Sequence, residues 1–118
     1  MSESTQATGQ AGENTGVAML RQAGFQVLDR NFRCRYGEVD AVARDGDTIV
    51  FVEIKTRKTG AFGSPQEAVT GRKQARIARV AAQYLKLRGW LERPVRFDVI
   101  ALGPEGREHL RDAFRPGA

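Results

Sequence analysis

The chain has 118 residues, 41% of them hydrophobic and 28% charged, which is the size and composition of one globular domain. The fully apolar runs, such as residues 49–52, are far shorter than the ~20 residues that cross a bilayer, which excludes a membrane-spanning helix. The single cysteine, Cys34, excludes an internal disulfide, and no signal-peptide pattern is present, so we expect a cytoplasmic protein.

Positive charge is concentrated in one part of the chain. Residues 55–96 carry eleven basic and two acidic side chains, a net charge of +9, whereas residues 1–54 carry a net charge of −3. Such a block favours a polyanionic partner, which is either nucleic acid or an anionic membrane surface. The alternative is a solvated helix face that keeps the protein soluble, and charge alone leaves these interpretations open.

The N-terminal half predicts a tail, a helix and three extended segments. Residues 1–11 have few apolar side chains and predict a disordered tail. A helix is expected over residues 13–22, then extended segments over residues 25–35, 38–44 and 48–55. Asp-Gly in the Asp45-Gly46-Asp47 turn is typical of a tight hairpin between the last two strands.

The C-terminal half predicts a loop, a long helix and further extended structure. After a loop over residues 56–64, Ser64 and Pro65 predict a helix start, and Gly89 predicts its end just after Arg88. A strand is expected over residues 95–102, and residues 108–114 predict a short strand or helix. The order α-β-β-β-α-β predicts an α/β domain over residues 12–114, with a mixed sheet flanked by helices and a tail at 115–118.

The long helix is expected to be apolar on one side and cationic on the other. Its apolar positions, which fall on one stripe, are Val69, Ile77, Val80, Ala81 and Tyr84. Its polar and basic positions, which fall on another stripe, are Arg72, Arg76, Arg79, Gln83 and Lys86. One side of the helix therefore faces the core, and the other is free to contact an anion.

Three charged residues are expected to meet near the end of the predicted hairpin. Alternation along a strand puts Glu53 and Lys55 on one face, and a hairpin centred on Gly46 places Asp40 opposite Val52, beside Glu53. Two carboxylates suit Mg²⁺, and a neighbouring lysine orients water or stabilises developing negative charge. The alternative is a structural salt bridge from Glu53 to Lys55 or Arg57, and spacing alone leaves both readings open.

These residues resemble a known signature. Gly37-Glu38-Val39-Asp40, twelve intervening residues and Glu53-Ile54-Lys55 resemble the motif of PD-(D/E)XK nucleases, with a spacing similar to that of archaeal Holliday junction resolvases. More closely, residues 12 to about 114 resemble the YraN family of small bacterial proteins. The matching segments include Gly12-Glu13, Gly24-Phe25, residues 30–35, residues 50–57, residues 62–65 and residues 96–99.

The resemblance implies a restriction-endonuclease-like fold and a metal-dependent endonuclease acting on DNA, with branched or repair intermediates among the candidate substrates. It implies that Asp40, Glu53 and Glu13 bind Mg²⁺ or Mn²⁺ and that Lys55 assists the attacking water. By analogy with resolvases it also suggests a homodimer. The alternative is a non-catalytic nucleic-acid-binding module with the same fold.

Several further residues are candidates for contact with nucleic acid. The expected backbone-binding residues are Thr56, Arg57, Lys58, Arg72, Lys73, Arg76 and Arg79. Tyr36 and Trp90 either stack on a base or pack against the core. We expect a surface role for His109, and we expect Asp98 to pair with a nearby arginine outside the site.

Overall fold

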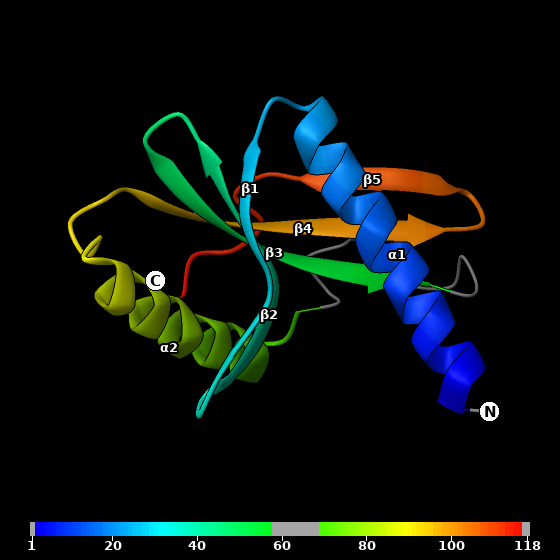
Figure 1. Ribbon diagram of the computed structural model, residues 1–118, viewed down its shortest axis with the longest axis horizontal. Coiled ribbons are helices and arrows are strands. Elements are labelled where there is room, and N and C mark those ends of the chain that lie inside the picture. The colour runs from blue at the N-terminus through cyan, green and yellow to red at the C-terminus, as the bar shows by residue number, and fades with distance from the viewer. Residues whose placement is uncertain (1, 58–68, 117–118) are drawn as a thin grey trace.

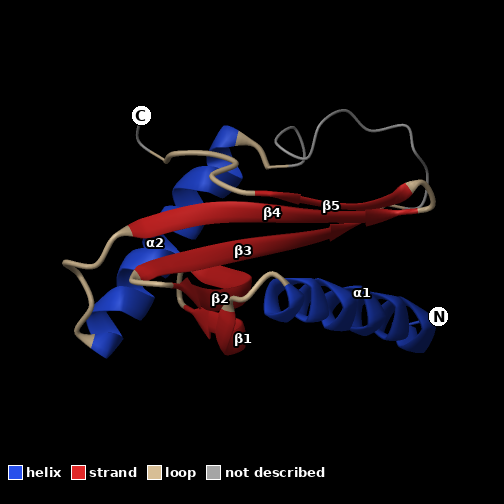
Figure 2. Cartoon of the chain, turned by 90° about the horizontal axis from the view of Figure 1, so that it is seen from above, coloured by secondary structure: helices blue, strands red, loops and turns tan. Residues whose placement is uncertain are grey.

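The computed structural model describes residues 2–57 and 69–116, and of residues 2–9 only the backbone. One five-stranded sheet lies between two helices (Figures 1 and 2). The elements in chain order are α1 (Ser2–Gln22), β1 (Gln26–Cys34), β2 (Gly37–Asp45), β3 (Thr48–Thr56), α2 (Gly71–Arg88), β4 (Val95–Gly103) and β5 (Gly106–Leu110).

The strands lie in the spatial order β1-β2-β3-β4-β5. β3 and β4 are parallel and are joined by the connection that contains α2, whereas the other neighbouring pairs are antiparallel. Successive side chains of β3 enter opposite layers: Val50 and Val52 pack with Leu20 of α1, while Phe51 packs with Tyr84 of α2. The α/β class and the mixed sheet flanked by helices, both predicted from the sequence, are confirmed. This architecture is consistent with a nuclease-like fold.

α1 begins at Ser2, so the helix extends through the segment for which composition predicts a tail. Its buried side chains include Val17 and Leu20, and Gly24, with φ +91°, follows its end. Gly16 lies against Ile54 of β3, because a Cβ at this position would be 2.7 Å from Ile54 Cδ1. The glycine weakens the helical pattern in the sequence but lets the helix backbone approach the sheet closely.

α2 begins later than the sequence predicts. Thr70 is its N-cap, and the Thr70 hydroxyl accepts a hydrogen bond from the Lys73 backbone N–H at 3.3 Å. Val69, expected inside the helix, precedes it but is still buried, whereas the predicted cap at Ser64 lies outside the described residues. The helix ends as predicted at Gly89, whose φ is 73°. Neither helix, over the described residues, has the length and apolarity needed to cross a membrane.

The C-terminal strand pair carries a buried charge network. The Asp98 side chain is fully buried and accepts hydrogen bonds from Arg96 Nε at 2.9 Å and from the Asp112 backbone N–H at 3.0 Å. This confirms the predicted arginine partner. The surface role expected for His109 is wrong, because its side chain is only 12% exposed and Nε2 lies 2.9 Å from Asp98 Oδ2. β5 ends at Leu110, so the short strand begins and ends earlier than predicted.

Candidate active site

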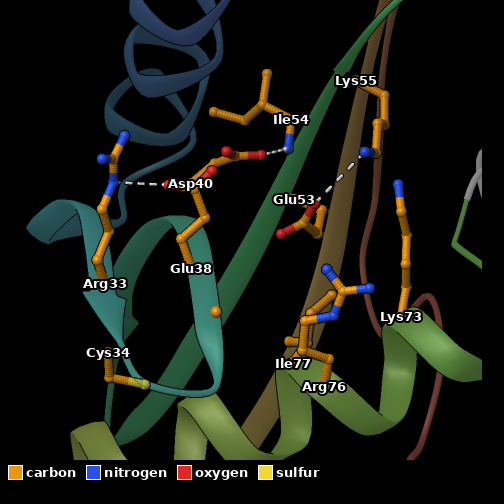
Figure 3. A pocket seen from close by; sticks show the side chains of 11 residues that line it. Arg33, Cys34, Glu38, Asp40, Glu53, Ile54, Lys55, Lys73, Arg76 and Ile77 are labelled. Atoms are coloured by element: carbon orange, nitrogen blue, oxygen red, sulfur yellow. Dashed lines mark hydrogen bonds and ion pairs between the residues drawn. The ribbon is translucent and has the colours of Figure 1, made fainter.

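A cavity of about 640 Å³ opens between α2 and the adjacent parts of β2 and β3 (Figure 3). Its lining residues, which come from β1, β2, β3 and α2, are Arg33, Cys34, Gly37, Glu38, Asp40, Glu53, Ile54, Lys55, Lys73, Arg76 and Ile77. The cavity brings together Asp40, Glu53 and Lys55, as the alternation and hairpin arguments predict. Three charged groups from two strands, Asp40 on β2 and Glu53 and Lys55 on β3, therefore line one cavity.

Asp40 is held against β3 by its own side chain. The β2–β3 register runs up to the pair Ala41↔Val52, one residue away from the predicted pairing of Asp40 with Val52. Beyond this pair, Asp40 Oδ2 accepts a hydrogen bond from the Ile54 backbone N–H at 2.7 Å. The carboxylate thus takes the place of a backbone acceptor on β2 and is anchored next to Glu53.

Burial raises the pKa of Asp40 above its ordinary value, and the negative charges of Glu38 and Glu13 act in the same direction. The Ile54 hydrogen bond and the Lys55 charge oppose this shift but do not cancel it. Asp40 therefore lies in a place where a negative charge is only partly compensated by the protein.

Glu53 is the more strongly perturbed carboxylate. Its side chain is 12% exposed, and Lys55 Nζ lies 3.7 Å from Glu53 Oε2. Burial and then the charge of Asp40 raise the pKa of Glu53 to about 7, against the opposing charges of Lys55 and Lys73. The predicted Glu53–Lys55 salt bridge is therefore present, but one long ion pair does not neutralise two neighbouring carboxylates.

Two ammonium groups face each other across the cavity. The ends of Lys55 and Lys73 point toward one another, from β3 and α2 respectively (Figure 3). Contact with Lys55 and then burial lower the pKa of Lys73 below its ordinary value, and the like charge of Arg76 adds to this effect. A group of cations that repel one another favours a bound anion, and a phosphate has the matching charge.

The donor set fits a magnesium-type ion held by two carboxylates. Asp40 and Glu53 supply hard oxygen ligands, and a divalent cation between them would offset the burial and repulsion that raise both pKa values. Among the described residues, no group of three or more acidic, histidine or cysteine side chains is placed to hold a metal. Mg²⁺ commonly keeps several waters and needs only one or two protein carboxylates, so two ligands are sufficient.

Glu13 lies outside the cavity. Its Oε1 accepts a hydrogen bond from Arg30 Nε at 3.1 Å, and both of its carboxylate oxygens lie 2.9 Å from Asn31 Nδ2. Asn31 has a positive φ of 51°, a conformation that asparagine tolerates better than most residues. The contacts of Glu13 therefore join α1 to β1, and its charge raises the pKa of Asp40. The metal-ligand role that the resemblance implies for Glu13 stays a prediction.

The predicted backbone-binding residues are divided among different places. Lys73 and Arg76 line the cavity, while Arg72 and Arg79 are exposed on α2 and Thr56 is exposed at the end of β3. The Arg57 backbone N–H donates to the Leu102 carbonyl at 2.7 Å. Lys58 lies outside the described residues.

Two charged residues of the cavity were missed by the sequence argument. Arg33 and Glu38 face each other across the β1–β2 turn with Arg33 Nε 2.8 Å from Glu38 Oε2, and both are exposed. Glu38 raises the pKa of both Asp40 and Glu53. Glu38 lies two residues before Asp40 on the same strand, so alternation already places both side chains on one face. No local sequence pattern indicated that Arg33 lines the cavity.

Comparison with known proteins gives a family. Residues 12–102 match the uncharacterised protein family UPF0102. The chain belongs to this family. This confirms the resemblance to the YraN family, which is the same family. All the cavity residues described above lie within the matched range.

UPF0102 proteins from several bacteria match most of this chain. A UPF0102 protein of Geobacter sulfurreducens is 50% identical over 111 residues, covering 90% of this chain and 87% of the relative. One from Rhodococcus jostii is 49% identical over 113 residues, covering 92% and 96%. One from Syntrophus aciditrophicus is 48% identical over 111 residues, covering 91% and 87%. The match extends over nearly the full length of these relatives.

Proposed function

We propose that this protein is a divalent-metal-dependent endonuclease that hydrolyses phosphodiester bonds, with DNA as the substrate. The observation that carries the proposal is the convergence of Asp40, Glu53 and Lys55 in one cavity whose opposite wall carries Lys73 and Arg76. Acidic groups suited to a metal and basic groups suited to a phosphate are thereby placed within one space. This combination is what metal-assisted hydrolysis of a phosphodiester requires.

Five cavity residues take part in this chemistry. Asp40 and Glu53 would hold Mg²⁺ or Mn²⁺, and the hydrogen bond from the Ile54 backbone N–H fixes the orientation of Asp40. The ion, when bound, polarises the phosphoryl group and lowers the pKa of a bound water. Lys55 orients the attacking water and stabilises negative charge that develops on the phosphate, while Lys73 and Arg76 bind the phosphate itself.

A second candidate function is a nucleic-acid-binding module without catalysis. The Glu53–Lys55 ion pair favours it, because an ion pair that stabilises the end of β3 needs no catalytic role. The two candidates differ in their need for metal. A nuclease cuts only with Mg²⁺ or Mn²⁺, whereas a binding module holds nucleic acid equally well in EDTA.

The test is a cleavage assay with labelled single-stranded, duplex, flap and four-way-junction DNA and the matching RNAs. Each substrate is incubated with Mg²⁺, with Mn²⁺ and with EDTA, using the wild type, Asp40→Asn, Glu53→Gln and the exposed control Glu92→Gln. We expect metal-dependent cutting by the wild type and the control, and loss of cutting in both cavity variants. Cutting that persists in Asp40→Asn contradicts the proposal, and salt-sensitive binding without any cutting supports the binding module instead.

A further inference from the structure

A second hollow, of about 480 Å³, lies farther along α2, toward the C-terminal end of the helix. Its lining residues, which combine aromatic, apolar, amide and cationic groups, are Tyr36, Arg79, Ala82, Gln83, Lys86 and Leu91. None of these lines the cavity described above, although Arg79 is one of the predicted backbone-binding residues. The side chain of Leu91 is unusually open for a leucine, since the residue is 63% exposed.

The hollow and the cavity adjoin where the β1–β2 turn meets α2. Gly37 and Arg76 line the cavity, and their neighbours Tyr36 and Arg79 line the hollow. The turn rests on the helix at this junction, because a Cβ at Gly37 would lie 2.8 Å from Arg76 Cδ. From Arg76 to Lys86 the helix rises ten residues, or about 15 Å, which is room for several consecutive phosphates.

The chemistry of the hollow matches a nucleotide rather than an apolar ligand. Tyr36 supplies an aromatic ring that is only half-buried, and part of it packs against the core beneath α2. Arg35, an exposed residue, lies over a face of this ring, with its guanidinium carbon 4.8 Å from the ring centroid and Nη2 donating to Tyr36 Oη at 2.6 Å. A base that stacks on this face therefore replaces the Arg35 guanidinium. Gln83 offers an amide for a base edge, and Arg79 and Lys86 offer charge for a phosphate.

We infer that this hollow binds an unpaired nucleotide next to the phosphate in the cavity, so that the substrate contains a single-stranded segment. The inference rests on the proposed function, because it takes the cavity as the place of the reacting phosphate. The physical reason is access: bases within a duplex are stacked on one another, whereas a single strand can lay a base face on an aromatic side chain. A cationic groove with an aromatic platform is the usual arrangement for such strands.

The test measures binding in EDTA by fluorescence anisotropy. The probes are a short labelled oligothymidylate, an abasic oligomer of equal phosphate number and a duplex, and the proteins are the wild type, Tyr36→Ala and Tyr36→Phe. We expect Tyr36→Ala to bind the oligothymidylate about 5- to 100-fold more weakly, as loss of one stacked base implies, and to bind the abasic oligomer as the wild type does. Tyr36→Phe keeps the ring and is expected to bind like the wild type.

Equal losses on the base-containing and abasic probes, or no loss with Tyr36→Ala, overturn the inference. Lys86→Ala provides a measurement that leaves the ring in place. It is expected to weaken binding of both single-stranded probes and to reduce the salt slope by about 0.7. An unchanged slope contradicts the phosphate contact.

The inference and the proposed function fail in different experiments. Binding that depends on Tyr36, in a protein that never cuts with Mg²⁺ or Mn²⁺, supports the single-strand site and contradicts the nuclease. Cutting that is lost in Asp40→Asn, together with binding that is unaffected by Tyr36→Ala, supports the nuclease and contradicts the single-strand site.

Discussion

Replacing Glu53 with glutamine removes a buried charge that the folded protein stabilises poorly. Burial and Asp40 raise the pKa of Glu53 from 4.5 to about 7. Each unit by which the pKa of Glu53 differs between the folded and unfolded states corresponds to about 1.4 kcal/mol, so this pKa shift corresponds to ~3 kcal/mol. The side chain is only 12% exposed, so solvent screening reduces this figure little.

The sign of the effect follows from proton binding. Between pH 4.5 and 7 the folded state retains a proton on Glu53 that the unfolded state has lost. The free energy of unfolding therefore falls as the pH rises through this window, and the stabilisation present below pH 4.5 is lost above pH 7. Glu53→Gln has no such proton to lose and is expected to be up to ~3 kcal/mol more stable than the wild type in metal-free buffer at pH 8.

Urea unfolding from pH 5 to pH 8, followed by circular dichroism in metal-free buffer, measures this difference. Glu92→Gln, at an exposed position outside the cavity, is the matched control and is expected to follow the wild-type profile. At pH 8, Mg²⁺ or Mn²⁺ is expected to raise the Tm of the wild type but not of Glu53→Gln, because a ligand stabilises only the state that binds it. A wild type that is more stable than Glu53→Gln at pH 8 without metal, or equal stabilisation of both by metal, would refute the reasoning.

Three other substitutions test separate parts of the structure. Lys55→Met is expected to slow cleavage about 100- to 1,000-fold while preserving the metal-induced rise in Tm; wild-type cleavage would contradict its role. Glu13→Ala is expected to lower the free energy of unfolding by ~1–3 kcal/mol, since it removes the carboxylate bonded to Arg30 Nε and Asn31 Nδ2, without removing the metal response in a thermal melt. A lost metal response would instead support Glu13 as a metal ligand. Gly16→Ala, which stabilises an ordinary exposed helix, is expected here to cost ~1–3 kcal/mol in urea unfolding because its Cβ meets Ile54. A stabilised variant would contradict the close packing.

Sequence reasoning succeeded for the strands because strand alternation is a local property. The pattern of residues 48–55 placed Glu53 and Lys55 on one face, and the structure brings both into the cavity with Asp40. Which residues pair across the hairpin depends on its register. Local sequence preference did not predict that Val52 pairs with Ala41 rather than with Asp40. Even so, the short turn at Gly46 limited the error to a single residue.

Sequence reasoning did not find side-chain partners that come from elsewhere in the fold. The contacts of Glu13 with Arg30 and Asn31 form only when α1 packs across β1. His109 reads as a surface residue, but the pairing of β5 with β4 brings it to the buried Asp98. Long-range contacts of this kind depend on packing between elements rather than on neighbouring residues.

The sequence by itself determined the α/β class, the cationic block, the ends of the helices at Gly24 and Gly89, and the shared face of Glu53 and Lys55. Each of these follows from backbone preference, charge or alternation among residues close in the chain. The tertiary structure alone decided that Asp40 bonds to Ile54 and that Lys73 faces Lys55. It also decided that the β1–β2 turn lies on α2, because each of these contacts joins elements whose approach is set by burial of the two apolar layers.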